Sequence, residues 1–264
     1  MERSLPDSAA LRDFFDRLAS ASGSVLLLDY DGTLAPFQIE RENAYPYPQV
    51  VPLLDRIIRT GKTRLVIVTG RPVADLDTFL RPLKNLEIWG AHGLEHLLPD
   101  GSCQKTRISS RALELLSQAK EWVIASKLIS AAEFKPGGIA IHWRGMPELE
   151  AGRLEAELRN RWSGLAINGE LKLLSFESGM ELRVVRPDKG DAVASIVKET
   201  GPVAPIAYLG DDLTDEDSFR ALDGRGLTVL VRPEFRETHA QVWLRPPQEL
   251  IGFLESWSNR VSQA

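Results

Sequence analysis

The stretch Val25-Leu-Leu-Leu-Asp-Tyr-Asp-Gly-Thr33 joins an apolar run to two acids that stand two residues apart. Four consecutive apolar residues between polar ones are typical of a strand that is buried on both faces of a sheet. The glycine after the second acid permits a tight turn at the end of this strand. Open α/β sheets bind ligands at this carboxyl end, so Asp29 and Asp31 are candidate site residues. Taken alone, the same residues also fit an Asx turn that leaves a strand.

Outward from this stretch, short apolar strands alternate with amphipathic helices. An opening helix is expected around residues 11–18, where apolar residues recur at helical spacing. Further buried strands are expected at 64–68, 86–89, 206–209 and 227–231, with helices between and after them. This alternation predicts an α/β fold with a doubly wound, mainly parallel sheet of the Rossmann type, covered by helices on both faces.

The pattern changes after the turn signal Pro99-Asp-Gly101. A helix, a strand, a second helix and two strands are expected next, and Asn168-Gly169 is the predicted hairpin turn between those two strands. This order is typical of an antiparallel α+β module. We therefore expect residues 1–100 and 184–264 to form one catalytic core, interrupted by an inserted α+β cap domain at 101–183.

Composition excludes several classes of function. A hydrophobic content of 43% and a charged content of 26% are ordinary for a globular protein, and the net charge of −5 gives no basic footprint for nucleic acid or an anionic membrane. The single cysteine, Cys103, forms neither a disulfide framework nor a thiolate metal site. No run approaches the ~20 apolar residues of a membrane span, and the run at 25–28 is too short for a signal peptide. We expect a cytoplasmic protein.

Other junctions between elements also carry groups that suit phosphate or a cation. Thr69-Gly-Arg71 follows the strand at 64–68, where a hydroxyl and a helix N-terminus can donate to phosphate. Lys189 precedes a later helix and can reach a phosphate as a point charge. Asp211 and Asp212 follow the strand at 206–209.

Each junction also has a plainer interpretation: a helix N-cap at Thr69, a solvated Lys189 and an acidic surface loop after Asp211. The combination is more specific, because the junctions of a doubly wound sheet meet at one edge. Oxygen ligands of this kind suit Mg²⁺, which takes one or two carboxylates together with water and substrate phosphate. The sequence therefore predicts a Mg²⁺ and phosphate site.

The four motifs resemble those of the haloacid dehalogenase superfamily of phosphatases and occur in the same order. Asp29-Tyr-Asp-Gly-Thr33 resembles the first motif, Thr69-Gly-Arg71 the second, Lys189 the third and Gly210-Asp-Asp-Leu-Thr-Asp215 the fourth. The inserted module lies between motifs two and three, where the C2 type of cap belongs in that superfamily.

Within the superfamily, the resemblance narrows to the trehalose-6-phosphate phosphatase family. The supporting stretches are Leu28-Asp-Tyr-Asp-Gly-Thr-Leu-Ala-Pro36, Gly90-Ala-His-Gly93, Ile141-His-Trp-Arg144, Glu181-Leu-Arg-Val-Val-Arg-Pro187 and Gly210-Asp-Asp-Leu-Thr-Asp-Glu216. Such an enzyme would hydrolyse trehalose 6-phosphate to trehalose and phosphate with Mg²⁺, and a trehalose-6-phosphate synthase would be its functional partner. The chain departs from the family at Thr69, often a serine, and at Trp143, commonly a tyrosine.

The resemblance implies that Asp29 attacks phosphorus and forms an aspartyl-phosphate, a recognised carboxylate role. Asp31 would protonate the leaving sugar oxygen and then activate water. Mg²⁺ would be held by the Asp29 carboxylate, the Asp31 backbone carbonyl and the Asp211 carboxylate.

Supporting roles follow from the same resemblance. Thr69 and Lys189 would hold the phosphoryl oxygens. Asp212 and Asp215 would orient Lys189 or metal-bound water. The acids that follow, Glu216 and Asp217, we interpret as ordinary first-turn acids of a short helix.

The sugar would be bound mainly by charged residues of the cap, because charged groups make the stronger hydrogen bonds to hydroxyls. The resemblance implies Glu133, Lys135 and Glu181 for this role, with Arg71, His92, His142, Arg144 and Arg183 as further substrate-binding candidates. His142 could equally be a half-buried strand histidine and Arg183 a solvated arginine. His96 and His239 are interpreted as surface residues.

Two other functions stay open on the sequence. A sugar phosphatase acting on sucrose phosphate or mannosylglycerate phosphate would differ only in its cap contacts. A non-enzymatic phospho-acceptor domain of the receiver type also uses Asp, Thr, Lys and Mg²⁺. Receivers, however, lack an inserted cap and lack an acid two residues after the acceptor.

Overall fold

The computed structural model describes residues 8–263 except 39, 168 and 177. The chain divides into two compact units, and the division falls after Gln104 and again after Asp188. We call Lys105–Asp188 the cap unit and the remainder the core unit. Both divisions lie a few residues beyond 100 and 183. β5 (Cys103–Lys105) is the last strand in the order of the core sheet, and β9 of the cap sheet ends at Val184.

The core unit contains an eight-stranded sheet in the order β12-β11-β10-β1-β2-β3-β4-β5. The neighbouring strands from β12 to β3 are all parallel, while β4 is antiparallel to β3. The remaining strands of this sheet are β1 (Ser24–Leu28), β2 (Thr63–Val68), β3 (Glu87–Gly90), β4 (Glu95–Leu97), β10 (Ile206–Gly210), β11 (Leu227–Val231) and β12 (Val242–Leu244). The predicted α/β fold with a mainly parallel sheet is confirmed.

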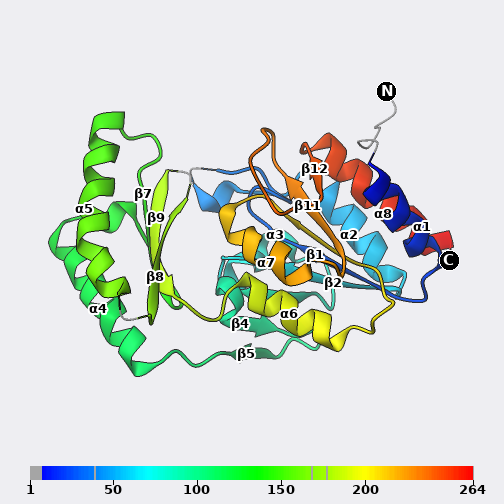
Figure 1. Ribbon diagram of the computed structural model, residues 1–264, viewed down its shortest axis with the longest axis horizontal. Helices are drawn as coiled ribbons and strands as arrows, with labels where there is room; N and C mark the ends of the chain where they lie inside the picture. Colours follow the sequence, from blue (N-terminus) through cyan, green and yellow to red (C-terminus); the bar gives the residue numbers. More distant parts are fainter. Residues whose placement is uncertain (1–7, 39, 168, 177, 264) are drawn as a thin grey trace. The chain divides into compact units, whose positions relative to one another are not determined.

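Helices cover both faces of this sheet (Figure 1). The core helices are α1 (Ala9–Ser20), α2 (Val50–Arg59), α3 (Val73–Leu80), α6 (Lys189–Glu199), α7 (Glu216–Leu222) and α8 (Gln248–Gln263), with short 3₁₀ turns η1 (Arg41–Asn43), η2 (Ala91–Gly93) and η4 (Leu213–Asp215). Leu26 and Leu28 pack with α1, α2 and α8, whereas Val25 and Leu27 pack with α6 and α7. Successive side chains of a strand point to opposite faces, which explains why β1 is apolar throughout.

The cap unit is a four-stranded antiparallel sheet with two long helices. Its sheet order is β6-β7-β9-β8, and its elements are β6 (Ala132–Lys135), β7 (Gly138–His142), β8 (Leu171–Phe176), β9 (Gly179–Val184), α4 (Ser110–Ala125), η3 (Ile129–Ala131) and α5 (Glu148–Ala166). Figure 1 shows α4 and α5 on the same face of this sheet. The buried Ile139 and Leu182 are on the strands, and the buried Leu158 and Trp162 are on α5.

The predicted position of the cap hairpin is wrong. Gly169 lies between α5 and β8, and Asn168 lies outside the described residues. The paired strands are β8 and β9, joined by a turn that contains Ser178. Gly169 has a φ of 75°, and a glycine in this conformation also commonly ends a helix. The Asn-Gly signal therefore follows α5 and does not join two strands.

Throughout the described part of the chain, every helix is too short or too polar to cross a bilayer.

Candidate active site

The site lies where the strand order of the core sheet reverses. β1 pairs with β2 on one side and with β10 on the other. The residues that follow these three strands therefore meet at one edge, and they include Asp29, Thr69 and Asp211. This is the switch point at which doubly wound sheets bind their ligands.

Lys189, the first residue of α6, joins two of the acids at this edge. Its Nζ lies 2.8 Å from Oδ1 of Asp29 and 2.8 Å from Oδ1 of Asp215. All three side chains are buried. An ion pair is stronger in such a low-dielectric setting than in water, but each charge depends on its partner.

Asp215 uses both of its carboxylate oxygens within the protein. Oδ1 accepts hydrogen bonds from Lys189 Nζ at 2.8 Å and from the Tyr208 hydroxyl at 2.6 Å. Oδ2 accepts the backbone N–H groups of Asp211 and Asp212, each at 3.0 Å. Asp215 thus ties the lysine to the turn after β10. Sequence reasoning missed Tyr208, although a buried tyrosine in a strand usually needs a partner for its hydroxyl.

The arrangement of carboxylates fits a divalent cation. Oxygens of Asp29, Asp211 and Asp215 all lie within 4.8 Å of one another. Oδ1 of Asp211 is buried and has no hydrogen-bond partner among the described residues. Since Asp215 is already saturated, Asp29 and Asp211 are the carboxylates that can serve as direct ligands. Hard oxygen donors in this number are typical of Mg²⁺ sites.

The cluster holds more negative than positive charge, and the pKa values of its groups reflect this imbalance. Burial, together with the charge of Asp215, raises the pKa of Asp29 to about 7, and the lowering by Lys189 offsets this only in part. Burial, Asp29 and Asp215 likewise raise the pKa of Asp211 well above its ordinary value. Burial lowers the pKa of Lys189, but Asp215 and Asp29 outweigh it and the net shift is upward. One lysine thus faces three acids, and a bound cation would relieve the imbalance.

Asp31 is held by Arg71 of the second motif. The guanidinium donates from Nε to one carboxylate oxygen at 2.7 Å and from NH2 to the other at 2.6 Å. Its carbon lies 5.3 Å from the ring centroid of Tyr30 and 5.4 Å from that of Phe79. Bidentate pairing and stacking on aromatic faces are both specific to arginine. The structure thus places Arg71, a predicted substrate-binding residue, against the predicted acid.

A strained turn, η2, donates backbone hydrogen bonds to the second motif. Ala91 and His92 of η2 have φ values of 47° and 57°, a region that non-glycine residues seldom adopt. The Ala91 N–H donates to the Arg71 carbonyl at 2.7 Å, and the His92 N–H donates to the Thr69 carbonyl at 3.0 Å. The His92 ring occupies the space that a Cβ at Gly70 would need. His92 therefore packs on the backbone between Thr69 and Arg71.

The Thr69 hydroxyl also has a local role, since it accepts the Arg71 N–H at 3.1 Å. A hydroxyl that accepts this hydrogen bond still has its own proton to donate. The interpretation of Thr69 as a helix N-cap is wrong, because the N-cap residue of α3 is Pro72. The hydrogen bond that Thr69 accepts is compatible with its interpretation as a phosphate donor.

The cap candidates share one face of the cap sheet. Glu133 is opposite Ala140, and Ala140 is opposite Glu181, so both acids point to the same side. The same parity applies to Lys135, His142 and Arg183. Arg144 follows β7 and lies in a turn.

These cap residues form a connected network of charges. Lys135 Nζ lies 3.0 Å from Oε1 of Glu181 and 3.5 Å from Oε2 of Glu133. His142 Nε2 lies 3.1 Å from the same Glu133 oxygen, and Arg183 Nε lies 3.8 Å from Oε2 of Glu181. The opposite face carries the apolar side chains under α4 and α5.

Two interpretations of outlying residues need correction. His96 is not a surface residue, because its ring stacks on Trp89 at 3.9 Å and its Nε2 lies 2.9 Å from Glu87. Glu216 does lie in the first turn of α7, as predicted, but it is buried and binds Arg236. Arg236 is 20 positions from Glu216, so no local pattern reveals that pair, whereas the partners of His96 lie on the neighbouring strand β3.

The fold, together with the four motifs at the carboxyl edge of the core sheet, defines a phosphatase of the haloacid dehalogenase superfamily. A sequence profile described as trehalose-phosphatase matches residues 27–241, which is more than half of the chain. The protein belongs to the trehalose-phosphatase family, and it is a phosphoric monoester hydrolase rather than a phospho-acceptor domain.

Individual relatives agree with this assignment. The trehalose-phosphate phosphatase of Mycolicibacterium paratuberculosis is 29% identical, with coverage of 98% of this chain and 68% of that protein. A solved trehalose-6-phosphate phosphatase related protein is 27% identical with a TM-score of 0.70, covering 88% of this chain and 96% of its own. The C-terminal domain of the Candida albicans trehalose-6-phosphate phosphatase has the same fold, with a TM-score of 0.81, 21% identity and coverage of 97% and 98%.

Proposed function

We propose that this protein hydrolyses trehalose 6-phosphate to trehalose and phosphate, with Mg²⁺ and through an aspartyl-phosphate on Asp29. The observation that supports this most is the buried cluster of Asp29, Lys189, Asp211 and Asp215, in which one Asp211 oxygen has no hydrogen-bond partner among the described residues. A bound Mg²⁺ would neutralise the charge between a carboxylate nucleophile and a phosphate dianion. Asp29 and Asp211 would hold it by their carboxylates, and Asp31 by its backbone carbonyl.

In the first step, an oxygen of Asp29 bonds to phosphorus as the bond from phosphorus to the sugar oxygen breaks. Lys189 is held 2.8 Å from Asp29, so it can also stabilise a phosphoryl oxygen that approaches the same carboxylate. Thr69 supplies a hydroxyl at the same edge of the sheet. The backbone N–H groups of the turn after β10 are already used by Asp215.

Asp31 would give a proton to the leaving sugar oxygen and then take one from the water that attacks the aspartyl-phosphate. The second step breaks the bond between phosphorus and Asp29 and restores the carboxylate. Both oxygens of Asp31 are bonded to Arg71. Each of these oxygens accepts one hydrogen bond from Arg71 and keeps a second lone pair, so Asp31 can hold a proton while Arg71 fixes the position of the carboxylate.

We propose that the two units divide the work, with chemistry in the core unit and sugar recognition in the cap unit. The charged face of the cap sheet supports this, because Glu133, Lys135 and Glu181 offer acceptors and a donor within one network. Sugar hydroxyls suit such a mixed set, since each hydroxyl both donates and accepts. A trehalose-6-phosphate synthase is the proposed functional partner because it would make the substrate.

The test is phosphate release from trehalose 6-phosphate, sucrose 6-phosphate and mannosylglycerate phosphate, each with Mg²⁺ and with a chelator. We expect turnover of trehalose 6-phosphate to exceed that of the other two by at least about a hundredfold and to cease on chelation. Higher turnover of either of the other sugar phosphates would overturn the proposed specificity for trehalose 6-phosphate. Undiminished turnover after chelation would overturn the proposed dependence on Mg²⁺.

A further inference from the structure

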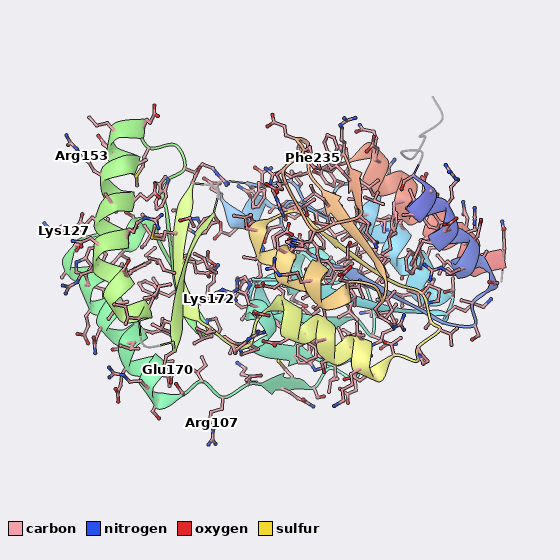
Figure 2. All side chains as sticks on the ribbon, viewed as in Figure 1. Arg107, Lys127, Arg153, Glu170, Lys172 and Phe235 are labelled. Atoms are coloured by element: carbon pink, nitrogen blue, oxygen red, sulfur yellow. The ribbon has the colours of Figure 1, made fainter. Side chains whose placement is uncertain are left out.

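An arginine that belongs to none of the four motifs contacts the turn after β10. Arg236 lies in the loop that follows β11 and comes directly after the exposed Phe235, which is labelled in Figure 2. Its Nε donates to the Asp211 carbonyl at 3.3 Å and its NH2 donates to the Asp212 carbonyl at 2.7 Å. One guanidinium therefore holds two consecutive carbonyl groups.

The arginine is itself fixed by its own loop and by α7. Its NH1 donates to the Glu237 carbonyl at 2.8 Å and to Oε1 of Glu216. Glu216 also accepts hydrogen bonds from the Thr238 hydroxyl at 2.8 Å and from the His239 backbone N–H at 2.9 Å. The guanidinium of Arg236 is thus held by its own loop and by α7 as well as by the turn.

The turn is consequently held from two sides. Asp215 accepts the N–H groups of Asp211 and Asp212, while Arg236 donates to both of their carbonyl groups. Arg232 also donates to the Asp211 carbonyl, from NH1 at 3.4 Å, whereas Arg236 joins the carbonyls of both residues. We propose that Arg236 is a positioning residue that keeps the Asp211 carboxylate facing Asp29, ready to bind the divalent cation. This inference rests on the metal site of the proposed function.

The physical reason is repulsion within the site. Asp211 lies within 4.8 Å of two other carboxylates, so a free Asp211 turn would relax away from them when no cation is bound. Relaxation before binding weakens the apparent affinity, because only part of the population can bind metal. Binding three carbonyl groups and a carboxylate at once also needs the planar fork of arginine, which a lysine does not offer.

The experiment compares the wild type with R236M and R236K, and with R220M as the matched control. Arg220 lies in α7 and pairs with the neighbouring Asp217 at an exposed position. Mg²⁺ binding is measured by calorimetry without substrate, and phosphate release is measured across a Mg²⁺ series. We expect Mg²⁺ to bind R236M at least tenfold more weakly and R220M unchanged. R236K should behave like R236M.

Excess Mg²⁺ should restore the turnover of R236M with an unchanged KM for the sugar phosphate, which a general loss of structure would not do. If R236M does not fold, E216Q provides the test, because it loosens the anchor of Arg236 and should also weaken Mg²⁺ binding. Mg²⁺ affinity equal to the wild type in a folded R236M would overturn the positioning role alone. A wild type that binds no Mg²⁺ would overturn the proposed metal site together with this role.

Discussion

Asp29 shows how one residue links stability to chemistry. It is buried between Lys189 and the other acids, and burial with the charge of Asp215 raises its pKa to about 7 from an ordinary value of 3.8. The folded protein therefore binds a proton on Asp29 more tightly than the unfolded chain does. Between these two pH values its contribution to the free energy of unfolding falls as the pH rises.

We expect the metal-free wild type to be less stable toward urea at pH 8 than at pH 5, and Mg²⁺ to reverse much of the loss at pH 8. In Asp29→Asn this part of the pH dependence should disappear. The same variant should lose phosphate release by at least about a thousandfold while remaining folded, because an amide is not a nucleophile here. Retained turnover in Asp29→Asn would exclude Asp29 as the nucleophile.

At the scale of elements, the turn after β1 and the cap sheet show how local geometry sets the site. The Gly32 N–H donates to the Ala35 carbonyl at 2.8 Å, and Gly32 has a φ of 76°. A Cβ at this residue would also collide with the Asp211 carboxylate. Gly61 has a similar φ of 66° but nothing lies within 4 Å of where its Cβ would be, so the two glycines form a matched pair.

Gly61→Ala should lower the free energy of unfolding by about 1 kcal/mol, the cost of a left-handed alanine. Gly32→Ala carries the same conformational cost and a steric one, at least ~2 kcal/mol together. Only Gly32→Ala should weaken Mg²⁺ binding. Urea unfolding measures the stability and calorimetry measures the Mg²⁺ binding. Equal stability losses in both variants would show that the Asp211 turn moves aside at no cost in free energy, which would contradict the steric argument.

In the cap sheet, Glu181→Ala should reduce kcat/KM for trehalose 6-phosphate by ten- to about a hundredfold, the usual effect of losing a charged hydrogen bond. Hydrolysis of p-nitrophenyl phosphate, which has no sugar, should be nearly unchanged. Glu157→Ala, at an exposed position of α5, is the control and should affect neither substrate. Equal losses on both substrates would mean that Glu181 does not recognise the sugar.

At the scale of the molecule, the two edges of the core sheet have different tasks. The carboxyl edge gathers the repelling acids of the site. Toward the other edge, Glu87 at the start of β3 accepts two hydrogen bonds from Arg64, each at 2.8 Å, and lies 2.9 Å from His96 Nε2. Burial raises the pKa of Glu87, but hydrogen bonds from Arg64 and His96 outweigh it, and the net shift is downward.

Glu87→Ala should therefore lower the free energy of unfolding by about 2–3 kcal/mol at neutral pH. This is less than the loss of a fully buried ion pair would cost, because Arg64 is partly exposed to solvent. KM and Mg²⁺ affinity should stay as in the wild type. The lowered pKa means that the contribution of Glu87 is present at neutral pH and lost on acidification, so the two proteins should converge in stability in acid. A changed KM would contradict the separation of the two edges.

Sequence alone was sufficient for the parts of the protein that depend on local order. An apolar run such as 25–28 is typical of a strand buried on both faces, and acids directly after such a strand lie at the carboxyl edge of a parallel sheet. The meeting of Asp29 with Asp211 followed from that rule. Where two local outcomes use the same signal, as at Gly169, sequence could not choose between a hairpin and a helix end.

Only the tertiary structure decided which side chain binds which. Arg71 reaches Asp31 across 40 positions and Arg236 reaches Asp212 across 24, and nothing in the spacing distinguishes these arginines from solvated ones. The sequence determined that the acids would lie together at the edge of the sheet. The folded chain determined which groups hold them there, because a buried charge takes its partner from whatever the packing brings within a few ångströms.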